Sequence, residues 1–101
     1  MVSFSVLLSV YWKENPVYLR ASLDSVFGQT IRASEVVLVE DGPLTPDLDR
    51  VVEEYEAKYP ELKVVKLPQN RGLGLALNEG MKHCTNELIA RMDTDDICKP
   101  Y

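Results

Sequence analysis

Three aspartates stand close together near the end of the sequence, at Asp93, Asp95 and Asp96. They follow an apolar run, residues 87–92, which predicts a strand that delivers them at its carboxyl end. Ionised carboxylates this close repel one another and resist dehydration, so they favour a divalent cation among them. Their hard oxygen ligands suit magnesium or manganese bridging to substrate phosphates. The alternative for so short a motif is an acidic turn that caps a helix, but the segments before it favour the metal site.

Two further polar clusters end earlier apolar runs. Tyr11 follows the run at residues 4–10, and its ring either stacks on a base or is an ordinary aromatic at the rim of the protein. Asp41 ends the run at residues 35–40, where its carboxylate either accepts a hydrogen bond from a base or ribose or forms a simple turn with Gly42. An aromatic ring and a carboxylate at strand ends are typical of a site that binds a nucleotide.

A third cluster, Asn70-Arg71-Gly72, opens a predicted helix. A helix amino terminus offers free N–H groups and partial positive charge, which suit a phosphate. Arg71 can reach a phosphate, lie near a base or pair with the aspartates. The glycines here are not the dinucleotide fingerprint, because they follow the third predicted strand rather than the first.

Strands and helices alternate along the whole chain. Buried apolar runs predict the strands, helical spacing of apolar residues predicts the helices, and Asn15-Pro16 and Thr45-Pro46 mark two helix starts. The expected strands are 4–10, 35–42 with a turn at its end, 62–67 and 87–92, and the expected helices are 16–27, 46–59 and 72–82. Short connections predict a three-layer α/β/α fold with a parallel sheet in the order 3-2-1-4. The three polar clusters at strand ends, residues 9–11, 41–42 and 93–95, then meet at the carboxyl edge of the sheet.

The third predicted helix is expected to place Leu73, Leu77 and Met81 in the core. Its glycines, Gly72, Gly74 and Gly80, are expected to allow close packing of the backbone.

Composition narrows the functional classes. The 101 residues make at most one domain, residues 1–101, with 46% hydrophobic residues. No stretch is long enough to span a bilayer, and the net charge of −5 argues against an open nucleic-acid surface. Cys84 and Cys98 form neither a disulfide framework nor a zinc site, so we expect reduced thiols in a cytoplasmic protein. His83, near a helix end, is expected to be structural.

Five segments together resemble the nucleotide-binding half of a GT-A, Rossmann-like glycosyltransferase of family 2. They are residues 6–11, 23–30, 37–42, 70–80 and 92–96. The resemblance covers essentially the whole chain. It implies metal-assisted, inverting transfer of a sugar from a nucleoside diphosphate sugar, of the UDP type, to an acceptor hydroxyl during polysaccharide biosynthesis. The acceptor would be a saccharide or a lipid-linked saccharide.

The resemblance also implies roles for individual residues. Those expected to line the nucleotide sugar are Ser9, Tyr11, Glu14, Asp41, Arg71 and Asp93. Asp95 is expected to coordinate manganese or magnesium directly, while Asp93 contacts the ribose or the metal through water. Asp96 either coordinates the metal or holds its waters.

No residue of this chain can be assigned as the catalytic base, which an inverting transfer requires. We therefore expect the base beyond Tyr101, in a longer enzyme that is cytoplasmic or peripheral to a membrane. The chain would then be a donor-binding half that is inactive and prone to self-association. Two alternatives stay open: a non-catalytic nucleotide-binding module and a nucleotidyltransferase. The second normally has a glycine-rich basic loop where this chain has residues 11–15.

Overall fold

The computed structural model describes residues 4–29 and 33–93. Four strands alternate with three helices in the predicted order, and every predicted boundary lies within two residues of the observed one. The elements are β1 (Ser5–Val10), α1 (Pro16–Phe27), β2 (Glu35–Glu40), α2 (Pro46–Lys58), β3 (Leu62–Lys66), α3 (Leu73–Lys82) and β4 (Ile89–Asp93). Among the described residues, no helix is both long enough and apolar enough to cross a bilayer.

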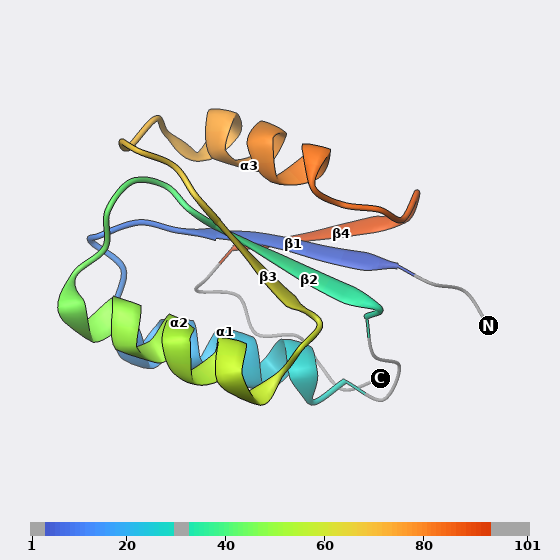
Figure 1. Cartoon of the computed structure of the whole chain (residues 1–101), viewed down its shortest axis with the longest axis horizontal. Helices are drawn as coiled ribbons and strands as arrows, with labels where there is room; N and C mark the ends of the chain where they lie inside the picture. The colour runs from blue at the N-terminus through green and yellow to red at the C-terminus, as the bar shows by residue number, and fades with distance from the viewer. Residues whose placement is uncertain (1–3, 30–32, 94–101) are drawn as a thin grey trace.

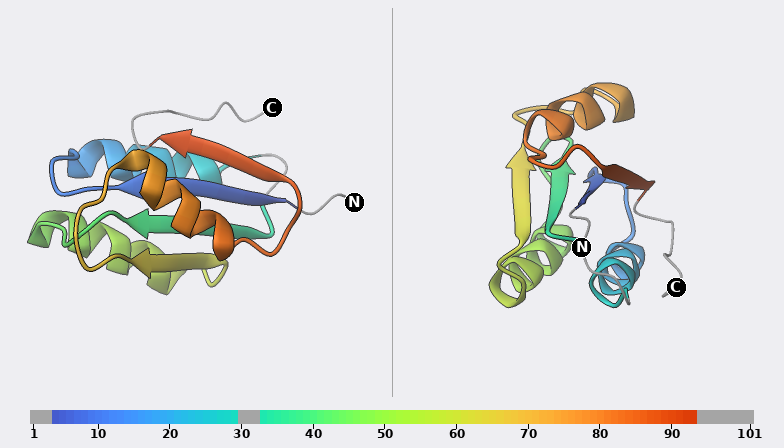
Figure 2. Two further views of the ribbon diagram at one scale, coloured as in Figure 1. Left: turned by 90° about the horizontal axis from the view of Figure 1, so that it is seen from above. Right: turned by 90° about the vertical axis from the view of Figure 1, so that its right-hand side faces the viewer.

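The four strands form one parallel sheet in the order β3-β2-β1-β4, which confirms the predicted order. Helices α1 and α2 cover one face and α3 covers the other, so the fold is a three-layer α/β/α arrangement (Figures 1 and 2). Because the strands are parallel, their carboxyl ends meet at one edge of the sheet, on the left in Figure 1. All three helices begin at this edge.

The two central strands are buried along their whole length, because helices cover both faces of the sheet. Successive side chains of a strand point to opposite faces. In β1, Val6, Leu8 and Val10 therefore pack in the core beneath α1 and α2, while Leu7 packs against the side that carries α3. Strand β3 is an edge strand with a mixed burial pattern, as its sequence predicted.

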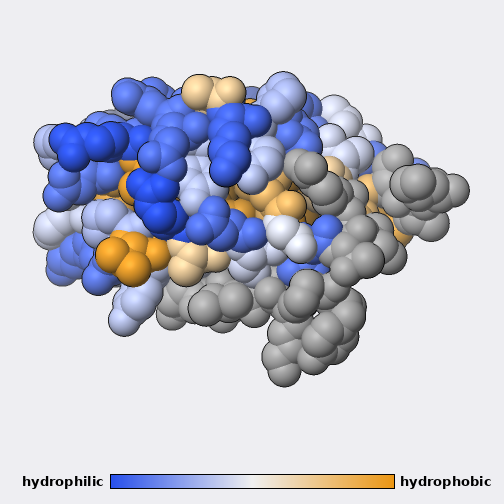
Figure 3. All heavy atoms as spheres, turned by 90° about the horizontal axis from the view of Figure 1, so that it is seen from below, coloured by the Kyte–Doolittle hydropathy of each residue, from blue (hydrophilic) through white to orange (hydrophobic). Residues whose placement is uncertain are grey.

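Helices α1 and α2 begin where their capping signals predict. The Asn15 side chain accepts a hydrogen bond from the Val17 amide at 2.8 Å, and the Thr45 hydroxyl accepts one from the Leu48 amide at 3.4 Å. Their inner faces are buried. Seen from the side on which α1 and α2 lie, the coloured surface is largely hydrophilic with small apolar areas (Figure 3). The outer faces of both helices therefore behave as ordinary solvent-facing surface.

Helix α3 packs on a different face from the predicted one. Leu73 is 52% exposed and Met81 is 38% exposed, so the prediction that they belong to the core is wrong. Ala76 and Gly80 are buried instead, and Leu77 is partly buried beside them. The reason is the closeness of the helix to the sheet, which leaves room only for the smallest side chains on the inner face.

Gly80 is the point of closest approach. A Cβ at this position would lie 2.4 Å from Leu7 Cδ1 and 2.6 Å from Val39 Cγ2, so its predicted role in close packing is confirmed. The same prediction is wrong for Gly72 and Gly74, because a Cβ there would meet no atom within 4 Å. Gly72 instead supplies a positive φ of 96° where the chain enters α3.

Candidate functional site

The polar segments singled out in the sequence meet at the carboxyl edge of the sheet. Ser9 lies opposite Asp93 in the register of β1 and β4, the two strands at the topological switch point. One strand further along, the Asp41 amide donates a 2.8 Å hydrogen bond to the Val10 carbonyl. Parallel strands with helical crossovers create this meeting of residues that are far apart in the sequence.

Asp41 is 4% exposed and holds the loop that leads into α3. Its Oδ1 accepts a hydrogen bond from the Arg71 amide at 2.7 Å, and its Oδ2 accepts one from the Gly72 amide at 3.0 Å. An ionised carboxylate has about four acceptor positions, so these two amides leave acceptor capacity for a ligand. The two amides are committed to Asp41, and Arg71 itself is an exposed residue.

Asn70 strengthens this connection and was missed as a site residue. Its side-chain amide donates to the Asp41 carbonyl at 3.2 Å. Gly42 has a φ of 88°, and a Cβ there would lie 2.6 Å from the Asn70 nitrogen, so the loop rests directly on the turn after β2. The Asp-Gly pair signalled the turn, but the sequence carried no signal that residues 69–70 would pack on it.

The β1–α1 connection forms the exposed rim of this edge. Tyr11 and Trp12 are both exposed, and the Glu14 amide donates to the Tyr11 carbonyl at 3.0 Å, which closes a tight turn before the Asn15 cap. Lys13 Nζ lies 5.1 Å from the centroid of the Trp12 ring. The turn therefore presents two aromatic faces beside the strand ends, where a flat base could stack.

Glu40, next to Asp41, is also buried but belongs to the other face of the sheet. Burial raises the pKa of its carboxyl group, the Lys66 charge lowers it, and the nearby acidic groups Asp49, Glu56 and Glu53 raise it further. The alternation of side chains along β2 thus directs one carboxylate of the Glu40–Asp41 pair towards the α3 side and the other towards α2.

The predicted metal ligands are only partly within the described residues. The backbone of Asp93 ends β4 at the switch point, and Asp95 and Asp96 lie outside the described residues. Within residues 4–29 and 33–93, no group of three His, Cys, Asp or Glu side chains is placed to hold a metal ion. The residue types nevertheless fit a hard divalent cation, because carboxylate oxygens are the ligands that such an ion prefers.

The remaining candidates lie at the far edge, where α3 ends. The His83 amide donates to the Gly80 carbonyl at 3.0 Å and closes the helix, a contact that any residue could make, so the structural role of the His83 side chain stays a prediction. Cys84 is a free, half-buried thiol whose pKa is raised by burial, and Cys98 lies outside the described residues.

Comparison with known sequences identifies a family to which this chain is similar. The model of "Glycosyl transferase family 2" matches residues 5–101. An uncharacterized glycosyltransferase of Haemophilus influenzae is 61% identical over 98% of this chain and 37% of its own length. The amylovoran biosynthesis glycosyltransferase AmsE of Erwinia amylovora is 50% identical over 96% of this chain and 36% of its own length. The chain thus spans little more than a third of these relatives.

Solved structures agree with this result. TarS 1-349 of S. aureus, in complex with UDP-GlcNAc, superposes with a TM-score of 0.81 at 32% identity, over 95% of this chain and 27% of that one. The mannosyltransferase PcManGT of Pyrobaculum calidifontis, in complex with GDP-Man and Mn²⁺, has a TM-score of 0.80 over 93% of this chain and 28% of that one. At 24% identity the second likeness shows the fold alone. By its family match and its relatives, this chain belongs to glycosyl transferase family 2.

Proposed function

We propose that the chain is the donor-binding part of a glycosyltransferase that takes a sugar from a UDP-type nucleotide sugar and transfers it to an acceptor hydroxyl. The observation that carries the proposal is the meeting of Ser9, Asp41, the Arg71 loop and the end of β4 at one edge of the sheet. In open α/β sheets, ligands bind outside the carboxyl ends of the strands at a switch point. The family and the relative solved with UDP-GlcNAc support a nucleotide sugar as this ligand.

The positions of the residues suggest a division of labour. Tyr11 offers a ring face to the base, and Asp41 offers its remaining acceptor positions to the base or ribose. Ser9 and Glu14 flank them on the β1–α1 side, and the Arg71 guanidinium offers positive charge to the diphosphate. The acceptor, a saccharide or lipid-linked saccharide, and the catalytic base belong to the longer enzyme in this proposal.

A divalent cation, manganese or magnesium, completes the proposed donor site. Asp95 would coordinate it directly, with Asp93 beside it on the ribose or a metal-bound water. When bound, the cation would offset the negative charge that builds on the diphosphate leaving group. The chain's own contribution is to end β4 at the switch point, the edge of the sheet at which the phosphates are proposed to bind.

Calorimetry with UDP tests the proposal. We expect this chain to bind UDP in the presence of Mn²⁺, and Asp95→Asn to weaken that binding while changing UDP binding in chelator very little. Asp47→Asn is the matched control, because it makes the same chemical change at an exposed carboxylate in the first turn of α2. Equal UDP affinity with Mn²⁺ and with excess chelator would contradict the role of the metal.

A further inference from the structure

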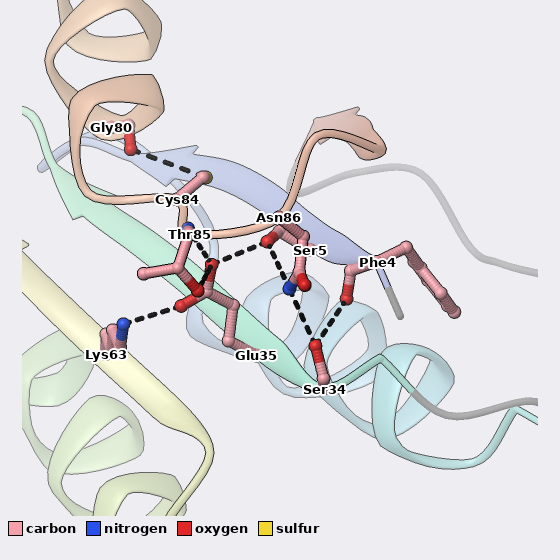
Figure 4. Close-up of polar contacts among 9 residues, drawn as sticks. All are labelled: Phe4, Ser5, Ser34, Glu35, Lys63, Gly80, Cys84, Thr85 and Asn86. Atoms are coloured by element: carbon pink, nitrogen blue, oxygen red, sulfur yellow. Dashed lines mark hydrogen bonds and ion pairs between the residues drawn. The ribbon is translucent and has the colours of Figure 1, made fainter. Parts of the chain in front are cut away.

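We propose that Glu35 is a positioning residue, which fixes the register of β4 through Thr85 and Asn86 and thereby places Asp93 at the donor site. Glu35 lies at the amino edge of the sheet, at the opposite end of the strands from that site (Figure 4). The inference rests on the proposed function for its effect on UDP binding, while its effect on β4 can be measured without any ligand.

The Glu35 side chain is 5% exposed, and both of its oxygens are engaged. Oε1 accepts hydrogen bonds from the Ser5 hydroxyl at 2.6 Å, from the Thr85 hydroxyl at 3.1 Å and from the Thr85 amide. Oε2 accepts one from Lys63 Nζ at 2.6 Å. A single buried carboxylate therefore joins β1, β2 and β3 to the segment that enters β4.

Asn86 adds a second connection in the same segment. Its side-chain amide donates to the Ser5 hydroxyl at 3.0 Å and to the Ser34 hydroxyl at 2.7 Å. Two residues later, the Leu88 carbonyl accepts a hydrogen bond from the Ser5 amide at 2.8 Å, which is the first rung between β1 and β4. The chain is thus held on both sides of Asn86 immediately before it becomes strand.

The described side chains of β4 do little to fix its register. Ala90 and Arg91 are exposed, Leu88 just before the strand is 56% exposed, and Ile89 is only partly buried. Among the described residues, β4 pairs with β1 alone. A strand whose side chains bury little surface is weakly specified in register, and a slip of one residue moves every side chain to the opposite face of the sheet.

These two observations together carry the inference. The described side chains of β4 specify its register only weakly, whereas Thr85 and Asn86 just before the strand are held by several hydrogen bonds. The register that results pairs Ser5 with Ile89 and Ser9 with Asp93. A glutamine at position 35 would keep the volume but would turn an N–H₂ group towards either the Thr85 amide or Lys63 Nζ, neither of which can accept a hydrogen bond. Only a carboxylate, which accepts on both oxygens, satisfies these two donors together.

Hydrogen exchange and UDP titration of Glu35→Gln in this chain test the proposal. We expect the β4 amides to lose about tenfold or more in protection relative to those of β2, because a charge-assisted hydrogen bond is lost. We also expect the affinity for UDP with Mn²⁺ to fall by about tenfold, while the affinity for UDP in chelator changes little. Asn86→Ala should act in the same direction without leaving an unpaired cation, so it serves if Glu35→Gln does not fold.

Tyr55→Phe is the control for a general loss of stability. The Tyr55 hydroxyl donates to Asp24 and to the Arg20 carbonyl at 3.4 Å, which ties α2 to α1 far from β4. The Tyr55→Phe substitution should lower stability without changing the protection of β4 relative to β2 or the effect of Mn²⁺ on UDP binding. Unchanged β4 protection in both Glu35→Gln and Asn86→Ala, or the same loss in Tyr55→Phe, would overturn the positioning role. Absence of UDP binding in the unsubstituted chain would overturn the proposed function instead, and the exchange result would still decide the role of Glu35.

Discussion

At the scale of single residues, Asp41 combines an observed structural role with a proposed role in donor binding. Its carboxylate holds the Arg71 and Gly72 amides, so it shapes the entrance to α3, and it also lies at the edge where the donor is proposed to bind. A carboxylate that already accepts two backbone hydrogen bonds is rigid, and a rigid acceptor loses little entropy when a base or ribose binds to it. The two functions therefore support each other.

Substituting Asp41 separates these functions. We expect Asp41→Ala to weaken UDP binding by roughly 1.5–3 kcal/mol more than it weakens binding of inorganic diphosphate, because the hydrogen bond to the base or ribose is lost for UDP alone while the Arg71 loop is disturbed for both ligands. Calorimetry with each ligand and Mn²⁺ gives both values. Asn70→Ala is the matched control, since it removes a hydrogen bond of the same loop and keeps the carboxylate. Equal weakening of both ligands by Asp41→Ala would show that Asp41 acts only through the loop.

The position of Asp41 was predictable from the sequence, but its partners were not. A buried run followed by Asp-Gly places the carboxylate at a strand end whatever the rest of the fold does. The partners are backbone amides of residues 71 and 72, which every sequence possesses. Which amides contact Asp41 depends on the conformation of the loop, and the spacing of hydrophobic residues does not predict that conformation.

At the scale of elements, the same distinction separates α1 and α2 from α3. The first two helices bury large apolar side chains at helical spacing, so both their boundaries and their inner faces were predicted. Helix α3 buries Ala76 and Gly80, which are small and add little to a hydrophobic pattern, while Leu73 and Leu75 lie on its exposed side. Of the predicted core residues only Leu77 packs partly against the core, so the pattern of large side chains was a poor guide to the inner face.

Alanine substitutions at two glycines of α3 test this packing. Gly80→Ala should reduce the free energy of unfolding by about 1–2 kcal/mol, because the strain of overpacking against Leu7 and Val39 exceeds the gain in helix propensity. Gly74→Ala, in the same helix with open space around it, should be neutral or stabilise by up to about 1 kcal/mol. Urea unfolding followed by circular dichroism measures both. Similar effects of the two substitutions would contradict the close approach at Gly80.

At the scale of the whole molecule, the sheet connects two functionally different edges. The predicted order 3-2-1-4 was correct because short right-handed crossovers leave few alternatives for such a chain. The carboxyl edge gathers the proposed donor site, and the amino edge holds the Glu35 carboxylate. Strand β2 has a buried carboxylate at each end, Glu35 and Glu40, and their pKa values are shifted in opposite directions.

The opposite shifts predict how stability depends on pH. Burial raises the pKa of Glu35, but hydrogen bonds from Lys63, Ser5 and Thr85 outweigh it and lower the pKa from 4.5 to about 2. The folded protein thus binds this proton less readily than the unfolded chain. The stabilisation, on the order of 3 kcal/mol, is present above the unfolded pKa and is lost as the pH falls towards about 2. Glu40, whose pKa is raised, has the opposite effect at higher pH, because the fold regains stability as the pH falls through the raised pKa towards the unfolded value of 4.5.

Urea unfolding at about pH 6 and about pH 3 checks this prediction in three proteins. Glu35→Gln should lose less of its free energy of unfolding on acidification than the unsubstituted chain, because it lacks the carboxylate whose protonation destabilises the folded state. Glu40→Gln should lose more, because the compensating protonation of Glu40 is gone. It is a matched control, since it makes the same substitution at the other end of the same strand. Parallel losses in all three proteins would mean that neither buried carboxylate controls the acid stability of the fold.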